Sequence, residues 1–169
     1  MSRPLSDAQR RQLTELVVQM TPRISAYVRR TFGPRVDCEE VVAETFCRAA
    51  QNFRAMQARP RADFFLLTIA RNLCLDALRR KRASNVEFGD RAAVNPDSGD
   101  ALSRSEEGGL VSRALEHLPE AQREVLVLRF SAGLTFEEIA KLLDIPLGTA
   151  LSRSHAAMER VRAELGVRT

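Results

Sequence analysis

The most apolar helical stretch of this chain reads Phe65-Leu-Leu-Thr-Ile-Ala-Arg-Asn-Leu-Cys-Leu-Asp-Ala-Leu-Arg-Arg-Lys-Arg82. Its apolar side chains cover most of the circumference of a helix, which is typical of a helix that runs through the middle of a bundle. We expect this helix to extend from about residue 62 to residue 82. The side chains expected to face its neighbours are Phe65, Leu66, Leu67, Ile69, Leu73, Cys74, Ala77 and Leu78.

One narrow stripe of the same helix stays polar: Thr68, Asn72, Asp76 and Arg80 follow one another at helical spacing. Two interpretations stay open, because such a stripe either presents groups to a partner or simply faces water. The run that ends the helix, Arg79-Arg80-Lys81-Arg82, either stabilises the helix end or presents positive charge to a partner. Cations stabilise the carboxyl end of a helix, but four in a row exceed what a helix end needs.

Two further helices are predicted on the amino-terminal side. Ser6 and Gln9 have capping-box spacing and begin a helix that ends at Phe32-Gly33-Pro34, with Pro22 expected to kink or divide it. Its apolar stripe is Leu13, Leu16, Val17, Met20, Ile24, Tyr27 and Val28. Asp37 and Glu40 repeat the capping spacing and begin a helix to about Phe53, followed by a basic loop from Arg54 to Arg61.

The helical pattern is lost between Ala83 and about Gly109. Asn95-Pro96-Asp97-Ser98-Gly99-Asp100 is a run of turn-forming residues, and acidic residues outnumber basic ones in this stretch. We therefore expect a flexible acidic linker over residues 84–109. It would join an amino-terminal helical domain, residues 1–83, to a carboxyl-terminal domain, residues 110–169.

The carboxyl-terminal part carries its own helical pattern. A short helix from Leu110 to Leu118 precedes one with Pro119 in its first turn, which carries Val125, Leu126, Leu128 and Phe130 and ends at Gly133. Thr135 and Glu138 form a third capping box, Asp144-Ile145-Pro146 is a tight turn, and a last helix runs from about Leu147 to Leu165. Two helices joined by so short a turn indicate a helix-turn-helix, although any packed helical hairpin gives a similar pattern.

Composition limits the classes of function. The chain has 169 residues, of which 44% are hydrophobic, enough to bury a core. Lys and Arg number 26 against 22 for Asp and Glu, and the pI is about 9.5, so a polyanionic partner is favoured weakly. Trp is absent and Tyr27 is the sole tyrosine, which argues against a carbohydrate site or an aromatic cage.

The sequence gives no support for catalysis. It lacks a Gly-rich phosphate loop, a plausible metal cluster and a Ser/His/Asp set, and capping explains the Glu137-Glu138 pair. We expect no cofactor, metal or small-molecule substrate. Cys38, Cys47 and Cys74 form no CxxC pair, which is typical of reduced thiols in the cytosol. The polar start of the chain predicts no signal peptide and no apolar run approaches about 20 residues, so we expect a soluble, cytoplasmic protein without membrane insertion.

Two sets of segments together resemble one protein family. The first is Asp37-Cys-Glu-Glu-Val-Val-Ala-Glu-Thr-Phe46 with the stretch 65–82. The second is Leu118-Pro-Glu-Ala-Gln-Arg-Glu-Val-Leu-Val-Leu-Arg-Phe130 with Leu134-Thr-Phe-Glu-Glu-Ile-Ala140 and Ile145-Pro-Leu-Gly-Thr149. They resemble regions 2 and 4 of the extracytoplasmic-function (ECF) sigma factors, sigma-70-type specificity subunits of RNA polymerase, and the likeness covers most of residues 6–165. The fold class implied is all-α, with two small helical domains on a flexible linker and a helix-turn-helix in the second.

The resemblance implies partners and site residues. Core RNA polymerase would bind Glu40, Glu44 and Phe46 through its clamp coiled coil, and an anti-sigma factor would regulate the protein. The promoter −10 element would be melted and held, with a base flipped into the loop 52–61, by Asn52, Arg59, Arg61, Asn72, Asp76, Arg79, Arg80, Lys81 and Arg82. Within this set the basic run 79–82 would contact phosphates. The −35 element would be read by Thr149, Ser152, Arg153 and His155.

Several positions depart from the family's pattern. Phe65 stands where Trp is usual, Ala43 where Gln is usual, and Leu151 and Ala156 where basic residues are common. The last helix would turn Ala150, Ser154, Ala157 and Val161 inward, and larger side chains are usual at the first two. Fewer cations and a thinner core imply weaker −35 binding. They also favour an alternative, a sigma-like mimic that binds an anti-sigma factor without initiating transcription, which the basic run 79–82 and the Asn72/Asp76 pair oppose.

Overall fold

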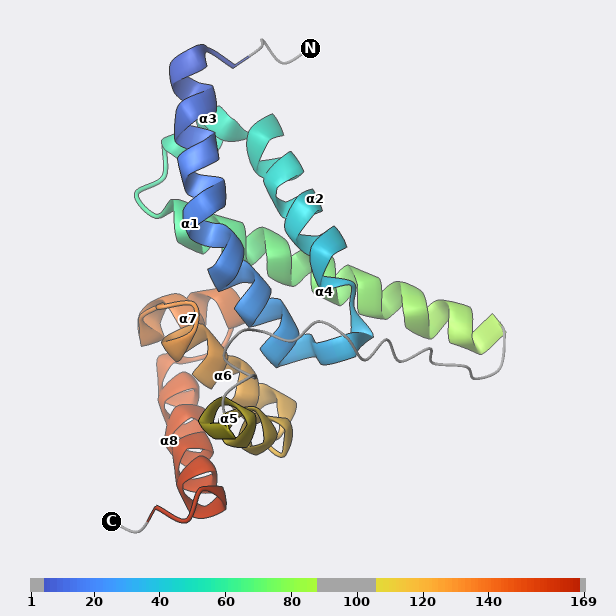
Figure 1. Cartoon of the computed structure of the whole chain (residues 1–169), viewed down its shortest axis with the longest axis vertical. Coiled ribbons are helices and arrows are strands. Elements are labelled where there is room, and N and C mark those ends of the chain that lie inside the picture. Colours follow the sequence, from blue (N-terminus) through green and yellow to red (C-terminus); the bar gives the residue numbers. More distant parts are fainter. Residues whose placement is uncertain (1–4, 88–105, 168–169) are drawn as a thin grey trace. The chain divides into compact units, whose positions relative to one another are not determined.

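The computed structural model describes residues 5–87 and 106–167. Within these residues the regular structure consists of eight α-helices and one short 3-10 helix (Figure 1), so the predicted all-α class is confirmed. The chain forms two compact units, one from Met1–Val28 and Arg35–Ala93, the other from Arg29–Pro34 and Val94–Thr169.

The first unit is built around its last helix. It contains α1 (Asp7–Phe32) as far as Val28, the last residue of the 3-10 helix η1 (Gly33–Arg35), α2 (Cys38–Gln51), α3 (Phe53–Gln57) and α4 (Ala62–Glu87). The end of α1 and the first two residues of η1 belong to the second unit. Helix α4 packs against α2 (Figure 1) and against α3, as expected for a helix in the middle of a bundle. The buried side chains of this core include Ile24, Tyr27, Val41, Phe53, Met56, Leu66, Leu67, Leu73 and Cys74.

The capping residues predicted for this unit begin its helices. The Gln9 amide donates to Ser6 Oγ at 3.3 Å, and the Ser6 amide donates back to Gln9 Oε1 at 3.0 Å, which completes a capping box. Asp37 accepts from the Glu40 amide at 3.0 Å and caps α2. Local side-chain chemistry therefore sets where both helices start.

Three predicted boundaries need correction. Of the two effects expected of Pro22, division of the helix is wrong, because α1 runs through Pro22 as one element. Proline removes the donor for the Val18 carbonyl, but Pro22 and Val18 lie on the exposed side of α1, where water can replace that donor. Helix α4 continues beyond Arg82 to Glu87, because residues 83–87 contain no Gly or Pro to end it. The predicted loop 54–61 is helical at its start, since Phe53 and Met56 bury their side chains in the short helix α3, which leaves 58–61 as the connection.

Over residues 106–167 the second unit has four helices: α5 (Glu106–Glu116), α6 (Glu120–Phe130), α7 (Phe136–Leu143) and α8 (Leu147–Glu164). Helix α8 packs against the other three. Its inward side chains Ala150, Ser154 and Ala157 are buried as predicted, and Val161 packs partly buried against the cluster of Leu118, Leu126 and Ala157. Pro119 precedes α6 as its N-cap, where the sequence had suggested a place inside the first turn.

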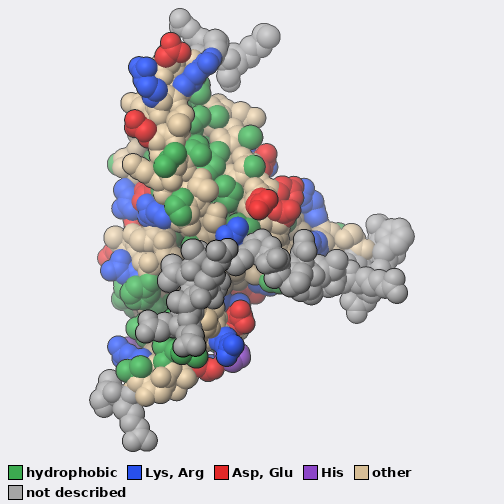
Figure 2. Space-filling model, in the orientation of Figure 1, with side chains coloured by type: hydrophobic (Ala, Val, Ile, Leu, Met, Phe, Trp, Pro, Cys, Tyr) green, Lys and Arg blue, Asp and Glu red, His purple; other side chains and the backbone are tan. Residues whose placement is uncertain are grey.

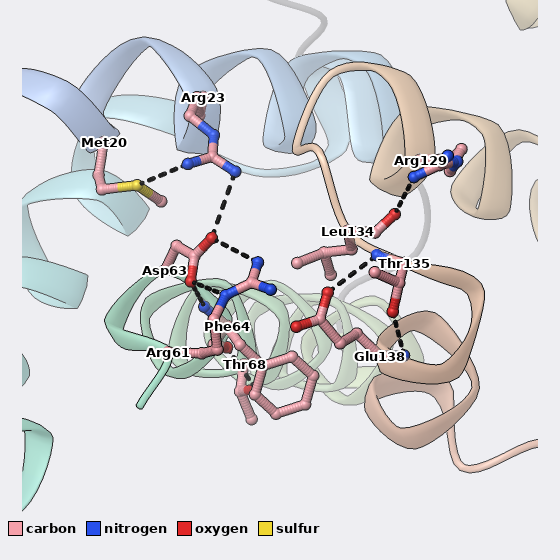
Figure 3. A network of polar contacts seen from close by, with 10 residues as sticks. All are labelled: Met20, Arg23, Arg61, Asp63, Phe64, Thr68, Arg129, Leu134, Thr135 and Glu138. Atoms are coloured by element: carbon pink, nitrogen blue, oxygen red, sulfur yellow. Dashed lines mark hydrogen bonds and ion pairs between the residues drawn. The ribbon is translucent and has the colours of Figure 1, made fainter. Parts of the chain in front are cut away.

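Short-range polar contacts fix the turns of the second unit. Thr135 Oγ1 accepts from the Glu138 amide at 3.2 Å, while Glu138 Oε2 accepts from the Thr135 amide at 2.8 Å (Figure 3). Asp144 ends α7 in the left-handed region at φ 53°, and the Ile145 amide donates to the Ala140 carbonyl at 3.0 Å. Helices α7 and α8 thus form the predicted helix-turn-helix.

The predicted domain boundaries at residues 83 and 110 fall within α4 and α5. Both helices extend further toward the linker than the sequence pattern indicated. Residues 88–105, the middle of the predicted linker, lie outside the described residues.

Candidate nucleic-acid interface

One face of α4 is polar and exposed to solvent. Asn72, Asp76, Arg79 and Arg80 are all exposed, whereas Thr68 is half-buried and donates from Oγ1 to the Phe64 carbonyl at 2.8 Å. Arg79 Nη1 donates to Asp76 Oδ1 at 3.1 Å, with side chains 75% and 52% exposed. The exposed stripe therefore begins at Asn72 and carries both hydrogen-bonding groups and cations.

The basic run at the end of this stripe is not uniform. Lys81 Nζ donates to the Arg35 carbonyl at 2.5 Å and so joins α4 to η1. Arg82 is exposed, Arg79 pairs with Asp76, and Arg80 turns toward α2. The four side chains thus have different surroundings, and Lys81 contributes to the fold itself.

A groove of about 300 Å³ lies between α2 and α4. Its polar lining consists of Asp37, Glu40, Glu44, Arg48 and Arg80, above the apolar side chains of Val41, Leu73 and Ala77. Arg48 Nε donates to Glu44 Oε1 at 2.7 Å within this lining. Figure 2 shows acidic and basic side chains next to each other on the face formed by these two helices.

The predicted polymerase residues divide between two sides of α2. Glu40 and Glu44 line the groove together with Arg80, which was predicted to bind DNA. Phe46 is half-buried and is not among the groove-lining residues. The groove therefore brings together side chains that the sequence had assigned to two different partners.

The connection between α3 and α4 contains two arginines that contact their own chain. The Arg59 guanidinium carbon lies 4.9 Å from the centre of the Phe65 ring, a cation–π geometry. Arg61 binds both carboxylate oxygens of Asp63, with Nε 2.9 Å from Oδ1 and Nη2 2.8 Å from Oδ2 (Figure 3). Asn52 caps α2, because its Nδ2 donates to the Arg48 carbonyl at 2.9 Å. The three −10 residues predicted in the stretch 52–61, namely Asn52, Arg59 and Arg61, thus all take part in intramolecular contacts.

Asp63 is the residue of this site that the sequence reasoning missed. It also accepts from the Phe64 amide at 2.9 Å and from Arg23 Nη2 of α1 at 3.5 Å. The hydrogen bonds from Arg61 lower the pKa of Asp63 below its usual 3.8 and outweigh burial, which raises it. In the sequence, Asp63 is marked only as an acid in the first turn of a helix, shortly after an arginine. That pattern by itself predicts no more than a favourable helix start.

The helix of the helix-turn-helix unit that would enter a groove, α8, is modest in charge. Ser152 Oγ donates to the Thr149 carbonyl at 3.1 Å, and His155 Nδ1 lies 3.8 Å from Glu159 Oε2. Ser152 and His155 are exposed, Thr149 and Arg153 half-buried, and the neighbouring Leu151 is 45% exposed. The four predicted −35 residues therefore lie together in the first half of α8.

Comparison with known proteins now decides the family. The sigma-70 region 2 model matches residues 16–84, and the sigma-70 region 4 model matches residues 114–163. The ECF RNA polymerase sigma-E factor of Escherichia coli K12 is 33% identical over 160 residues, covering 86% of this chain and 82% of its own length. RNA polymerase sigma factor CarQ of Myxococcus xanthus is 30% identical over 157 residues, covering 90% of this chain and 88% of its own. This chain is an ECF sigma factor.

The fold of this sigma factor also has a solved counterpart. The sigma factor RpoE of Bartonella quintana, crystallised with the anti-sigma factor NepR, superposes with a TM-score of 0.80 at 20% sequence identity. The superposition covers 94% of this chain and 99% of RpoE. This likeness confirms the helical fold, and the two family models and the relatives above confirm the family inferred from the two sets of segments.

The described residues contain neither a metal-ligand cluster nor a membrane-spanning helix. Residues 5–87 and 106–167 contain no group of three or more His, Cys, Asp or Glu side chains placed to hold a metal ion. In the same part of this sigma factor, none of the helices combines the length and the apolar character needed to cross a membrane.

Proposed function

We propose that this sigma factor binds core RNA polymerase and directs it to promoters, where it melts the −10 element and supports initiation without catalysis of its own. The observation that carries the proposal is the exposed polar face of α4. Asn72, Asp76, Arg79 and Arg80 offer hydrogen-bond donors, acceptors and positive charge on one rigid helix. Such a surface suits a single strand, whose backbone needs cations and whose bases need hydrogen-bonding partners.

The polymerase contact is proposed for α2. Glu40 and Glu44 project into the groove beside α4, and Phe46 flanks them on another side of the helix. Because Arg80 lines the same groove, a partner bound to Glu40 and Glu44 would lie next to the DNA face. We propose that the region-2 domain holds both contacts, and that the cytoplasm, where RNA polymerase works, is the site of action.

The −35 contact is proposed for α8. The capping box of Thr135 and the tight turn at Asp144 hold α7 and α8 in the arrangement by which such units place a helix in the major groove. Thr149, Ser152, Arg153 and His155 would face DNA, with Leu151 among them. The small number of cations supports weak or unusual −35 binding.

Regulation by an anti-sigma factor is proposed as well, and it leaves a second candidate function. A sigma-like mimic would bind an anti-sigma factor but would not start transcription. The low charge of α8 favours this candidate, and the exposed basic stripe of α4 opposes it, because a mimic has no need of a DNA surface.

Run-off transcription with core polymerase and a promoter library separates the two. We expect the full chain to produce defined start sites and to enrich promoters with common −10 and −35 sequences. A chain that produces no defined start site, although it is folded, contradicts the initiation function and favours the mimic. Core polymerase alone is the control for starts that do not depend on this protein.

A further inference from the structure

Two guanidinium groups fix the short connection between α3 and α4. The Arg59 guanidinium carbon lies 4.9 Å from the centre of the Phe65 ring, and Arg61 donates to both carboxylate oxygens of Asp63 at 2.8 and 2.9 Å. Pro60 stands between the two arginines and restricts the backbone on either side of itself. The segment 58–61 is thus held by contacts to Asp63 and Phe65, which both lie at the start of α4.

The carboxylate of Asp63 joins three parts of the region-2 unit. Its Oδ1 accepts from Arg61 and from the Phe64 amide at the start of α4, and its Oδ2 accepts from Arg61 and from Arg23 of α1 (Figure 3). The Asp63 side chain is only 19% exposed, whereas that of Arg61 is 42% exposed. A bidentate, charge-assisted pair such as Arg61–Asp63 fixes the orientation of the guanidinium as well as its distance from the carboxylate.

From these contacts we infer that Asp63 is a positioning residue for promoter recognition: it orients Arg61 and so sets the shape of the segment 58–61 that receives the −10 strand. This inference rests on the proposed function. It changes the role of Arg61 from a direct contact to the −10 element to part of the support of the segment. Neither the sequence pattern nor the family resemblance had assigned a role to Asp63.

Substitution of Asp63 by Asn distinguishes the two roles by the sign of the effect. If Arg61 bound phosphate directly, Asp63→Asn would raise affinity for any strand, because it removes a negative charge and loosens the hold on a cation. If Asp63 positions the segment, the same change lowers affinity for the correct −10 strand. Affinity for an unrelated strand would then stay the same or rise slightly.

The experiment uses holoenzyme made from the full chain and core polymerase. The probes are two fluorescent single-stranded oligonucleotides, one with the −10 sequence enriched from the promoter library and one with the same bases scrambled. We expect Asp63→Asn to weaken binding of the enriched strand by about tenfold, the scale of coupling between residues that share a polar network. Binding of the scrambled strand should change by less than about twofold, because the backbone contacts remain.

Two further variants make the result specific. Glu15→Gln removes one negative charge from an exposed position of α1 and should leave the affinities for both strands unchanged. Arg61→Lys keeps the charge but cannot form the bidentate pair with Asp63, so it should reproduce the loss of selectivity. It also replaces Asp63→Asn as the test if that variant fails to fold. Thermal unfolding of each variant shows whether it is folded.

The outcomes separate the inference from the function on which it rests. Equal or higher affinity of folded Asp63→Asn for both strands overturns the positioning role. Wild-type holoenzyme that does not prefer the enriched strand contradicts the proposed function instead. Loss of selectivity in both Asp63→Asn and Arg61→Lys, with Glu15→Gln unaffected, supports the positioning role.

Discussion

Arg79 donates to Asp76 one turn earlier on α4, with Nη1 3.1 Å from Oδ1. Both side chains are more than half exposed, at 75% and 52%, so water screens the pair and its net contribution to stability is small. A phosphate oxygen can therefore replace Asp76 as the partner of Arg79 with little loss. The pair holds the guanidinium on the polar stripe without burying it, which suits a residue that would meet DNA.

The first prediction concerns this cation and its neighbour. Arg79→Ala with Arg80→Ala should depress initiation and reduce the salt dependence of promoter binding by about one phosphate contact for each arginine that touches DNA. Core-polymerase binding should be nearly unchanged. Titration of labelled promoter at several salt concentrations, beside titration of core polymerase, measures both.

Two controls sharpen that prediction. Arg10→Ala with Arg11→Ala removes the same charge from the exposed start of α1 and should affect neither titration. The single variants separate the roles of the two arginines, because Arg80 lines the groove beside Glu40 and Glu44 while Arg79 pairs with Asp76. Equal loss of promoter and polymerase binding in Arg79→Ala would count against a DNA role for that residue.

The second prediction concerns acid stability. Hydrogen bonds from Arg61 lower the pKa of Asp63 in the folded state below its ordinary 3.8, which applies to the unfolded chain. A carboxyl whose pKa falls on folding contributes its full stabilisation above the unfolded pKa and loses it as the pH falls through the folded pKa. Wild type should therefore be more stable than Asp63→Asn at pH 6, and the difference should shrink below about pH 4.

Urea unfolding of both proteins at a series of pH values checks this prediction. Glu15→Gln, which removes an exposed carboxyl, should show no such convergence. A constant difference between wild type and Asp63→Asn down to pH 3 would mean that the contribution of Asp63 does not depend on its charge.

The third prediction concerns the helix-turn-helix unit. Thr135→Ala removes the acceptor for the Glu138 amide and breaks the capping box at the start of α7, which should cost about 1 kcal/mol of unfolding free energy. Thr135→Ser keeps the hydroxyl and should retain most of the stability. Chemical unfolding followed by circular dichroism compares the three proteins, and an unchanged Thr135→Ala would show that the cap is not needed.

The helices were predictable where local chemistry decides them. Capping side chains such as Ser6, Asp37 and Thr135 begin their helices because each satisfies a backbone amide within a few residues. Pro22 does not divide α1, because the cost of a proline depends on whether water reaches the freed carbonyl, which is a property of the tertiary fold. Helix α3 was missed because the burial of Phe53 and Met56 against other helices stabilises so short an element.

The contrast between local patterns and tertiary contacts also explains which parts of the candidate site could be predicted. The stripe from Asn72 to Arg80 could be predicted because its members share one helix face. The bond from Arg23 to Asp63 joins residues forty positions apart, and no local pattern indicates such a contact. For the same reason the groove that brings Arg80 beside Glu40 and Glu44 appears only when α2 and α4 are packed.

The last prediction concerns helix α8, where Leu151 is 45% exposed among the proposed −35 residues. Leu151→Arg should raise affinity for promoter duplex and increase the magnitude of its salt dependence by about one contact, because it adds a cation on the side that would face phosphates. Val167→Arg is the matched control, since it places the same charge at an exposed apolar position beyond the end of α8. Binding of duplex at several salt concentrations measures both variants. An equal gain in the two would reflect net charge alone, and no gain in either would mean that this side of α8 does not approach DNA.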